Sequence, residues 1–277
     1  MSLRSLQARF EDFDGHRSVV VRWQPARPPA AQVLFVPAFG DEMNQMRRMV
    51  ALAAEALARR GVASCVFDLY GTGDSSADFA DATVERWLAD CRAMVERVRA
   101  EAVPLMLIGC RLGAALASRL TYDLPAPVAG LIGWAPVLQG KSQLSGMLRA
   151  AAVARSQRPG AGGPDARAIW ASGQTAPLAG YPVSSVLAAQ LEALDASGAP
   201  RAQRSTLFDL RLPIGDDPVS PSEALRKRVA AWSEQGVPSD AVAIAGPAFW
   251  NVADLVDVPQ LIDQTVAAVM LASRAPA

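Results

Sequence analysis

The five residues Gly109-Cys-Arg-Leu-Gly113 carry the strongest chemical signal in this chain. They follow an apolar run typical of a strand, residues 105–109, and precede an Ala- and Leu-rich run typical of a helix. A Gly-x-Ser-x-Gly sequence in such a strand–turn–helix exposes a serine nucleophile for acyl transfer. The middle residue here is Arg111, whose guanidinium group has no lone pair with which to attack a carbonyl. The sequence therefore predicts the turn of an acyl-transfer enzyme without its usual nucleophile.

Cys110 is the neighbouring side chain that could replace the missing serine. A thiol at a helix N-terminus beside an arginine can have a lowered pKa and become nucleophilic. The residue before the centre of such a turn usually packs into the interior, however, where cysteine behaves as a small apolar side chain. We favour packing for Cys110 and keep a catalytic role as the alternative.

A base and an acid would be needed to complete a catalytic triad. The only histidine, His16, precedes the first predicted strand, and the loop after the last strand, residues 246–251, contains none. The acid would follow the strand that ends near residue 214, where Asp216 and Asp217 suit a turn. Asp217 is the alternative candidate for a catalytic carboxylate, and either aspartate could form an ion pair with Arg111.

Backbone donors could remain where the catalytic side chains are missing. The N–H groups of Phe39, after the second strand, and of Leu112, after the turn centre, occupy the positions of oxyanion-hole donors. Together with Arg111 and the helix dipole, they predict a site for a carboxylate or phosphate group. The alternative is that an acidic neighbour neutralises Arg111 internally; three candidates are Asp41, Glu42 and Asp216.

Other binding motifs are incomplete. Residues 68–76 contain Gly-x-Gly without the third glycine of a dinucleotide site, and no P-loop sequence is present. The aspartates that follow lack the spacing of an EF-hand loop, and one histidine with scattered cysteines does not suit zinc. We expect no cofactor and no metal ion.

Composition excludes further partner classes. The chain has 277 residues, 51% of them hydrophobic, with 27 basic and 27 acidic side chains, so no overall charge recruits nucleic acid or an acidic membrane. Residues 1–13 lack the apolar core of a signal peptide, and no run of about 18 apolar residues predicts a membrane span. Three widely spaced cysteines do not form a disulfide pattern. We expect a soluble, cytoplasmic protein.

Strand-type and helix-type segments alternate along the chain, which is typical of a doubly wound, mostly parallel sheet. Strands are expected at 18–23, 33–36, 64–67, 105–109, 128–134, 205–213 and 241–245. The first of them is expected at an antiparallel edge, because three prolines follow it. Helices are expected at 47–60, 83–99, from 113 onward, at 221–234 with Ser220 as N-cap, and at 259–273.

The alternation stops between residues 140 and 199. Strand signals vanish there, and two short Ala- and Leu-rich segments, 144–155 and 186–193, favour helices. We interpret the chain as a single domain over residues 1–277 with a helical cap inserted at about 140–199.

Four sequence blocks together resemble the exosortase A system-associated hydrolase 2 family, a branch of the α/β-hydrolase superfamily. They are Pro37-Ala-Phe-Gly-Asp-Glu-Met-Asn-Gln-Met-Arg-Arg48, Asp68-Leu-Tyr-Gly-Thr-Gly-Asp-Ser75 with residues 78–83, Gly109-Cys-Arg-Leu-Gly-Ala114, and Gly246-Pro-Ala-Phe-Trp250. The resemblance implies an α/β-hydrolase fold with arginine at the turn centre as a family feature. It also implies a link to bacterial exopolysaccharide production and protein sorting by exosortase.

Two functional interpretations remain open from the sequence. In the first, the protein is an accessory, anion-binding member of this family, with Phe39, Glu42, Arg111, Leu112 and Asp216 around a small anionic or acyl ligand. In the second, it hydrolyses or transfers an ester or thioester through Cys110 or a pocket carboxylate. A protein partner or a homo-oligomer is compatible with both.

Overall fold

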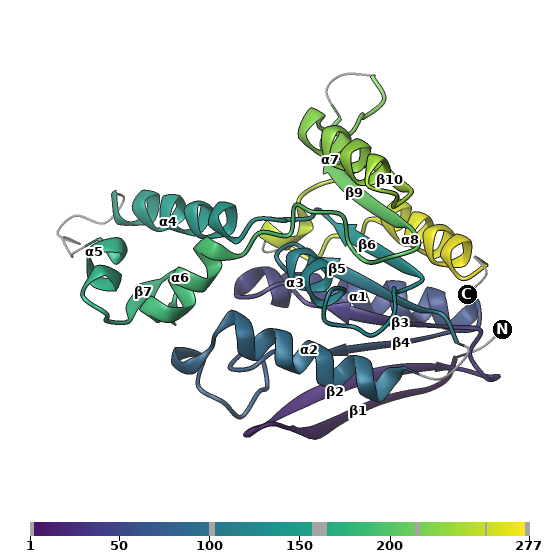
Figure 1. Cartoon of the computed structure of the whole chain (residues 1–277), viewed down its shortest axis with the longest axis horizontal. Coiled ribbons are helices and arrows are strands. Elements are labelled where there is room, and N and C mark those ends of the chain that lie inside the picture. The colour runs from purple at the N-terminus through teal and green to yellow at the C-terminus, as the bar shows by residue number, and fades with distance from the viewer. Residues whose placement is uncertain (1–2, 100–102, 157–164, 214–216, 253, 275–277) are drawn as a thin grey trace.

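The structure is a computed structural model that describes residues 3–99, 103–156, 165–213, 217–252 and 254–274. Its centre is an eight-stranded sheet (Figure 1). The strands in spatial order are β1 (Leu3–Phe13), β2 (His16–Pro25), β4 (Val62–Phe67), β3 (Ala31–Val36), β5 (Leu105–Cys110), β6 (Gly130–Trp134), β9 (Ser205–Arg211) and β10 (Ser239–Ala245). From β4 to β10 all neighbours are parallel, whereas β1 and β2 are antiparallel.

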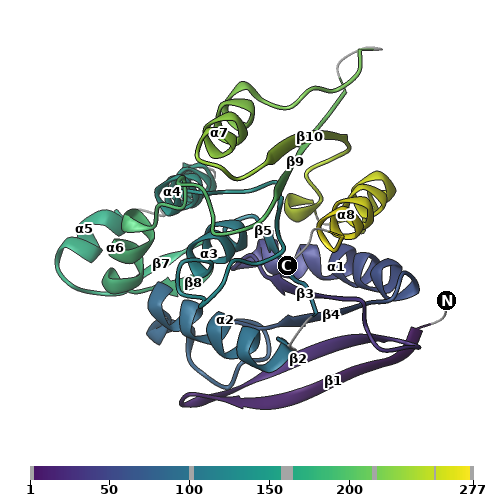
Figure 2. The ribbon, with the colours of Figure 1, turned by 45° about the vertical axis from the view of Figure 1, so that its right-hand side comes forward.

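Helices cover both faces of the sheet (Figure 2). One core lies beneath α1 (Asp41–Arg59) and α8 (Pro259–Ala272). The other lies beneath α2 (Val84–Val98), α3 (Gly113–Leu120) and α7 (Glu223–Glu234). The central strands β5 and β6 are buried along their whole length, as expected for parallel strands covered on both faces. The predicted α/β-hydrolase fold with a mostly parallel, doubly wound sheet is confirmed.

The N-terminal hairpin differs from the prediction. β2 is antiparallel as expected, but it is not the edge strand, because β1 pairs with it along its length. Little of β1 is buried, so its sequence lacks the alternation that marks a half-buried strand. The available signal was Asp14-Gly15, a favoured two-residue hairpin turn, in which Gly15 has φ 78°.

Two helices also begin at residues other than the predicted ones. α1 begins at Asp41, six residues before the predicted start, and follows Gly40, whose φ is 68°. The acidic first turn of α1 suits the helix dipole, although its polar sequence hides the apolar periodicity. α7 begins after Ser222 rather than after the predicted cap Ser220.

The inserted segment contains a small hairpin as well as helices. Its elements are α4 (Gly140–Ser156), α5 (Ala166–Ala171), β7 (Ala176–Leu178), β8 (Tyr181–Val183) and α6 (Ser185–Ala193). They lie together at one side of the sheet (Figures 1 and 2). The expectation that strands are absent here is wrong, because strands of three residues are too short to show periodicity. None of the helices in the described residues is both long enough and apolar enough to span a bilayer.

Candidate functional site

The turn between β5 and α3 has the backbone of a nucleophile elbow. Arg111 adopts a φ of 53°, a left-handed conformation that a non-glycine residue holds only when its surroundings impose it. A Cβ atom on Gly113 would lie 2.2 Å from the Val36 carbonyl oxygen, and one on Gly109 would lie 2.3 Å from the Ala114 Cα. Both glycines are therefore required by close backbone packing, and they fix Arg111 at the turn centre.

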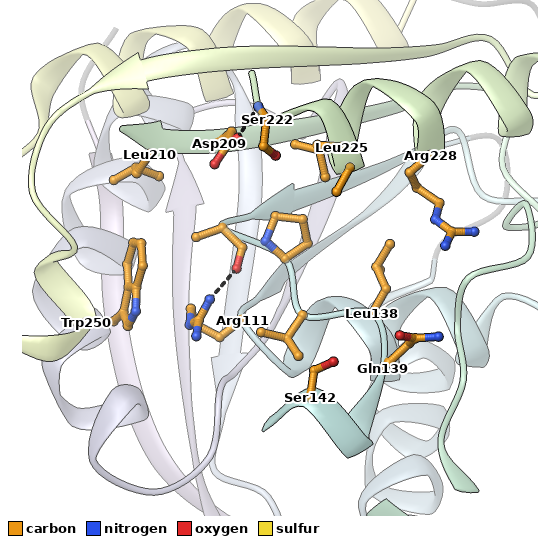
Figure 3. Close-up of a pocket in the computed structure, with 14 residues that line it drawn as sticks. Arg111, Leu138, Gln139, Ser142, Asp209, Leu210, Ser222, Leu225, Arg228 and Trp250 are labelled. Atoms are coloured by element: carbon orange, nitrogen blue, oxygen red, sulfur yellow. Dashed lines mark hydrogen bonds between the residues drawn. The ribbon is translucent and has the colours of Figure 1, made fainter. Parts of the chain in front are cut away.

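The Arg111 side chain is held on three sides. Its Nε donates to Glu42 Oε1 at 3.0 Å, and its Nη1 donates to the Ala135 carbonyl oxygen at 2.9 Å. Its guanidinium carbon lies 4.8 Å from the centre of the Trp250 ring, within reach of a cation–π interaction (Figure 3). Of the acidic neighbours considered, the structure places Glu42 against Arg111. Asp217 is exposed, and Asp216 lies outside the described residues.

Glu42 also connects the turn to the inserted segment. Its Oε2 accepts a hydrogen bond of 3.1 Å from Nε2 of the buried Gln143 in α4. One residue earlier, Asp41 Oδ1 accepts a bond of 3.1 Å from the Tyr181 hydroxyl of β8. The first turn of α1 thus supports both the Arg111 side chain and the segment that contains α4 and β8.

Cys110 lies in the core and not in the site. Its side chain is fully buried within the core beneath α1 and α8. Burial raises the pKa of the Cys110 thiol far above its ordinary value, so the thiol stays protonated at neutral pH. This placement agrees with a packing role and argues against a thiolate nucleophile.

The two predicted oxyanion donors lie at neighbouring strand ends. Val36 of β3 pairs with Gly109 of β5, so Phe39 and Leu112 each follow the sheet edge by three residues. Neither backbone N–H donates to another group in the described part of the chain. The side chains of both residues are buried, which leaves the backbone as their contribution to a site.

A pocket of about 390 Å³ opens beside Arg111 (Figure 3). Apolar side chains form part of its lining, with Leu138, Leu210 and Leu225 among them. Polar groups reach it from the strand ends, from α4 and from α7; they are Gln139, Ser142, Asp209, Ser222 and Arg228. The Asp209 carboxylate accepts the Ser222 backbone N–H at 2.7 Å.

Asp209 and Arg228 line the pocket but were not predicted from the sequence. Asp209 lies inside the predicted strand 205–213, near the end where the central strands place their functional loops, and this position was the available signal. Arg228 lies in mid-helix among other basic residues, and no local pattern distinguishes it.

His16 lies away from this pocket. Its ring packs between Phe13 and Tyr70, with centroid distances of 5.2 and 4.8 Å, and its Nε2 lies 3.6 Å from Asp90 Oδ2. In the loop after β10, where a hydrolase would place its base, Trp250 faces Arg111 instead. Among the described residues, no cluster of three or more His, Cys, Asp or Glu side chains could bind a metal ion.

Comparison with known proteins adds sequence and fold relatives. A family model described as serine aminopeptidase, S33 matches residues 27–167, about half of the chain. The mitochondrial palmitoyl-protein thioesterase ABHD10 of Mus musculus is 32% identical over 109 residues, which cover 39% of this chain and 35% of that protein. The chain thus matches about a third of the length of this curated relative.

Solved structures share the fold over the whole chain. Est1E from Butyrivibrio proteoclasticus, in a structure with bound ferulic acid, superimposes with a TM-score of 0.66 at 19% identity, and the match covers 97% of this chain and 100% of the Est1E chain. A monoglyceride lipase from Saccharomyces cerevisiae superimposes with a TM-score of 0.64 at 14% identity. The match covers 100% of this chain and 98% of the lipase chain. At these identities the likeness establishes the fold alone.

Proposed function

The chain belongs to the serine aminopeptidase S33 family, and from this premise we propose that its pocket binds a small anionic molecule through Arg111. The observation that carries the proposal is the fixed guanidinium at the centre of the elbow, beside a pocket of about 390 Å³. In this position the fold of an active relative would present a nucleophile. A group that cannot attack a carbonyl but binds anions well supports recognition rather than cleavage.

Arg111 retains binding capacity despite its ion pair with Glu42. Of its five N–H bonds, one on Nε and one on Nη1 are used, and Nη2 makes no hydrogen bond with the described residues. The N-terminus of α3 and the backbone N–H groups of Leu112 and Phe39 add positive potential at the same strand ends. A carboxylate or phosphate would bind to the free edge of the guanidinium.

The proposed biological setting rests on the sequence resemblance. An arginine at the elbow centre, together with the blocks at 37–48, 68–83 and 246–250, supports membership of the exosortase-associated branch. We therefore propose a cytoplasmic accessory role in bacterial exopolysaccharide production and exosortase-dependent sorting. A protein partner or a second copy of this chain would fit such a role.

Ester or thioester hydrolysis is the second candidate function, and one observation favours it. Asp209 places a carboxylate in the pocket, where it could activate a bound water molecule as general base. The curated relative, which this chain matches over about a third of its length, is a palmitoyl-protein thioesterase. A thioester is therefore the first substrate class to test.

Binding of octanoate, measured by isothermal titration calorimetry, tests the anion-binding function. We expect Arg111→Gln to weaken binding about ten-fold or more, because a hydrogen bond to a charged group contributes roughly 1.5–3 kcal/mol. Arg119→Gln is the matched control, since Arg119 lies in α3, the helix that follows the elbow, but pairs with Asp123 on the surface. Equal affinity in all three proteins would refute the proposal.

Turnover assays on a panel of substrates distinguish hydrolysis from anion binding. The wild type, Cys110→Ala, Asp209→Asn and Arg111→Ala are compared on short-chain esters and thioesters. Turnover that is well above background and is lost in Asp209→Asn would establish hydrolysis and displace the binding function. Loss in Cys110→Ala alone would instead assign the reaction to the buried thiol. A trace rate common to all four supports binding.

A further inference from the structure

The pocket has a second cationic side chain, Arg228, on the wall opposite Arg111 (Figure 3). Arg228 comes from α7, whereas Arg111 comes from the elbow, so the two side chains line the same cavity from different elements. Leu138 and Leu225 line the space between them in the view of Figure 3. The arrangement is a cation, an apolar stretch and a second cation.

Arg228 is held by a backbone hydrogen bond and forms no ion pair with the described residues. Its Nη1 donates to the Ser197 carbonyl oxygen, which also accepts the Trp232 indole N–H at 2.8 Å. No acidic side chain of the described residues lies within 4 Å of its guanidinium group, in contrast to Arg111 with Glu42. Hydrogen bonding from Ser197 and the nearby charge of Arg228 lower the pKa of the Asp195 carboxyl, so Asp195 balances part of the Arg228 charge without an ion pair within 4 Å. Arg228 keeps N–H donors that the described residues do not use.

Asp209 is the one carboxylate that lines this pocket within the described residues. It lies near the start of α7, where the Ser222 backbone N–H and the positive end of the helix dipole stabilise its charge. Figure 3 places Asp209 on the upper wall, apart from the Arg228 guanidinium. A ligand anion can thus contact Arg228 without an ion pair being broken first.

We propose that the pocket selects ligands with two anionic groups separated by an apolar spacer, one group bound at Arg111 and the other at Arg228. This inference rests on the proposed anion-binding function and adds the substrate class. A carboxylate or a phosphate suits each position, because a guanidinium binds both bidentately. The cavity of about 390 Å³ lies within the range typical of sites for small ligands.

The proposal is tested by comparing the affinity of straight-chain dicarboxylates of five to ten carbons with that of monocarboxylates of the same length, by isothermal titration calorimetry. We expect at least one diacid to bind the wild type about ten-fold or more tightly than its matched monoacid. Arg228→Gln should lower diacid affinity to that of the matched monoacid, and Arg228→Lys should keep most of the gain. A thermal unfolding midpoint for each variant verifies that it is folded.

Lys227→Gln provides the matched charge control. Lys227 precedes Arg228 in α7, has a side chain that is 76% exposed, and pairs with Glu223 away from the pocket. Its removal should leave the diacid gain unchanged, and an equal loss in both variants would mean that only the overall field of α7 matters. Equal affinity for diacids and monoacids overturns the second anion site. Monoacid binding that does not depend on Arg111 overturns the proposed function itself.

Discussion

At the residue scale, the site keeps a hydrolase backbone around a side chain of different chemistry. Arg111 holds the left-handed conformation that aims an elbow side chain at the pocket, and its peptide N–H donates to the Trp134 carbonyl at 3.0 Å. Its guanidinium contacts Glu42 on one side and Trp250 on the other. The residue identities at the elbow were evident from the sequence. The choice of Glu42 among the acidic candidates named from the sequence was not, since it depends on how α1 begins.

Asp90 is a buried residue with a testable pH dependence. It is 5% exposed, and burial raises its pKa to about 7, although the Tyr70 backbone N–H donates to its Oδ2 at 2.7 Å. The nearby His16 has a pKa lowered by burial, so it does not supply a full countercharge at neutral pH. The folded protein therefore holds a proton on Asp90 that the unfolded chain releases near pH 4.

The direction in which stability changes with pH follows from this difference in proton binding. The Asp90 contribution to stability is fully present below about pH 4 and is lost as the pH rises through about 7. We expect Asp90→Asn, which keeps an acceptor for Tyr70, to gain stability relative to the wild type between pH 5 and 7, by at most about 1.4 kcal/mol per pH unit. Urea unfolding of both proteins at pH 5, 6, 7 and 8 measures the difference. A difference that does not change with pH would show that Asp90 titrates normally.

At the scale of elements, the elbow depends on close contact between the start of α3 and the end of β3. Gly113→Ala would place a methyl group against the carbonyl oxygens of Val36 and Pro37, at 2.2 and 2.4 Å. Since backbone atoms cannot move aside cheaply, we expect a loss of about 3 kcal/mol or more in the free energy of unfolding. Gly146→Ala in α4 is the control, because its added Cβ would meet no atom closer than 4.0 Å. That change should stabilise by roughly 0.5–1 kcal/mol, and similar losses for both would contradict the packing argument.

Whether a helix or strand could be predicted from the sequence depends on whether its burial leaves an apolar pattern. β5, β6 and α2 carry long apolar patterns because they are buried, and the sequence located each of them within two residues. β1 is held mainly by its backbone hydrogen bonds to β2, and β7 and β8 are only three residues long, so none of these strands has a periodicity to detect. The pocket was visible only in part, because Asp209, Arg228 and Trp250 come from three segments that meet through tertiary packing.

At the scale of the whole molecule, the balance of charges and an open sheet edge both favour association between copies of the chain. The 27 basic and 27 acidic residues give no net charge near neutrality, and the isoelectric point is about 6.6. Electrostatic repulsion between copies is then weakest near that pH. β1 is the edge strand at one end of the sheet, and its Leu6 and Phe10 side chains are 55% and 56% exposed. An exposed edge of this kind is a template for pairing with another chain.

We therefore expect self-association that is strongest near pH 6.6 and that involves β1. Sedimentation velocity should show a larger mean mass at pH 6.6 than at pH 8.5, where net negative charge separates the copies. Leu6→Lys should suppress the increase, because a charge on an edge strand opposes pairing. Leu271→Lys adds the same charge at an apolar position of α8 that is 50% exposed, so it should shift the pH profile without removing association. Equal suppression by both substitutions would assign the effect to net charge alone, and a mass independent of pH and concentration would exclude pairing through the β1 edge.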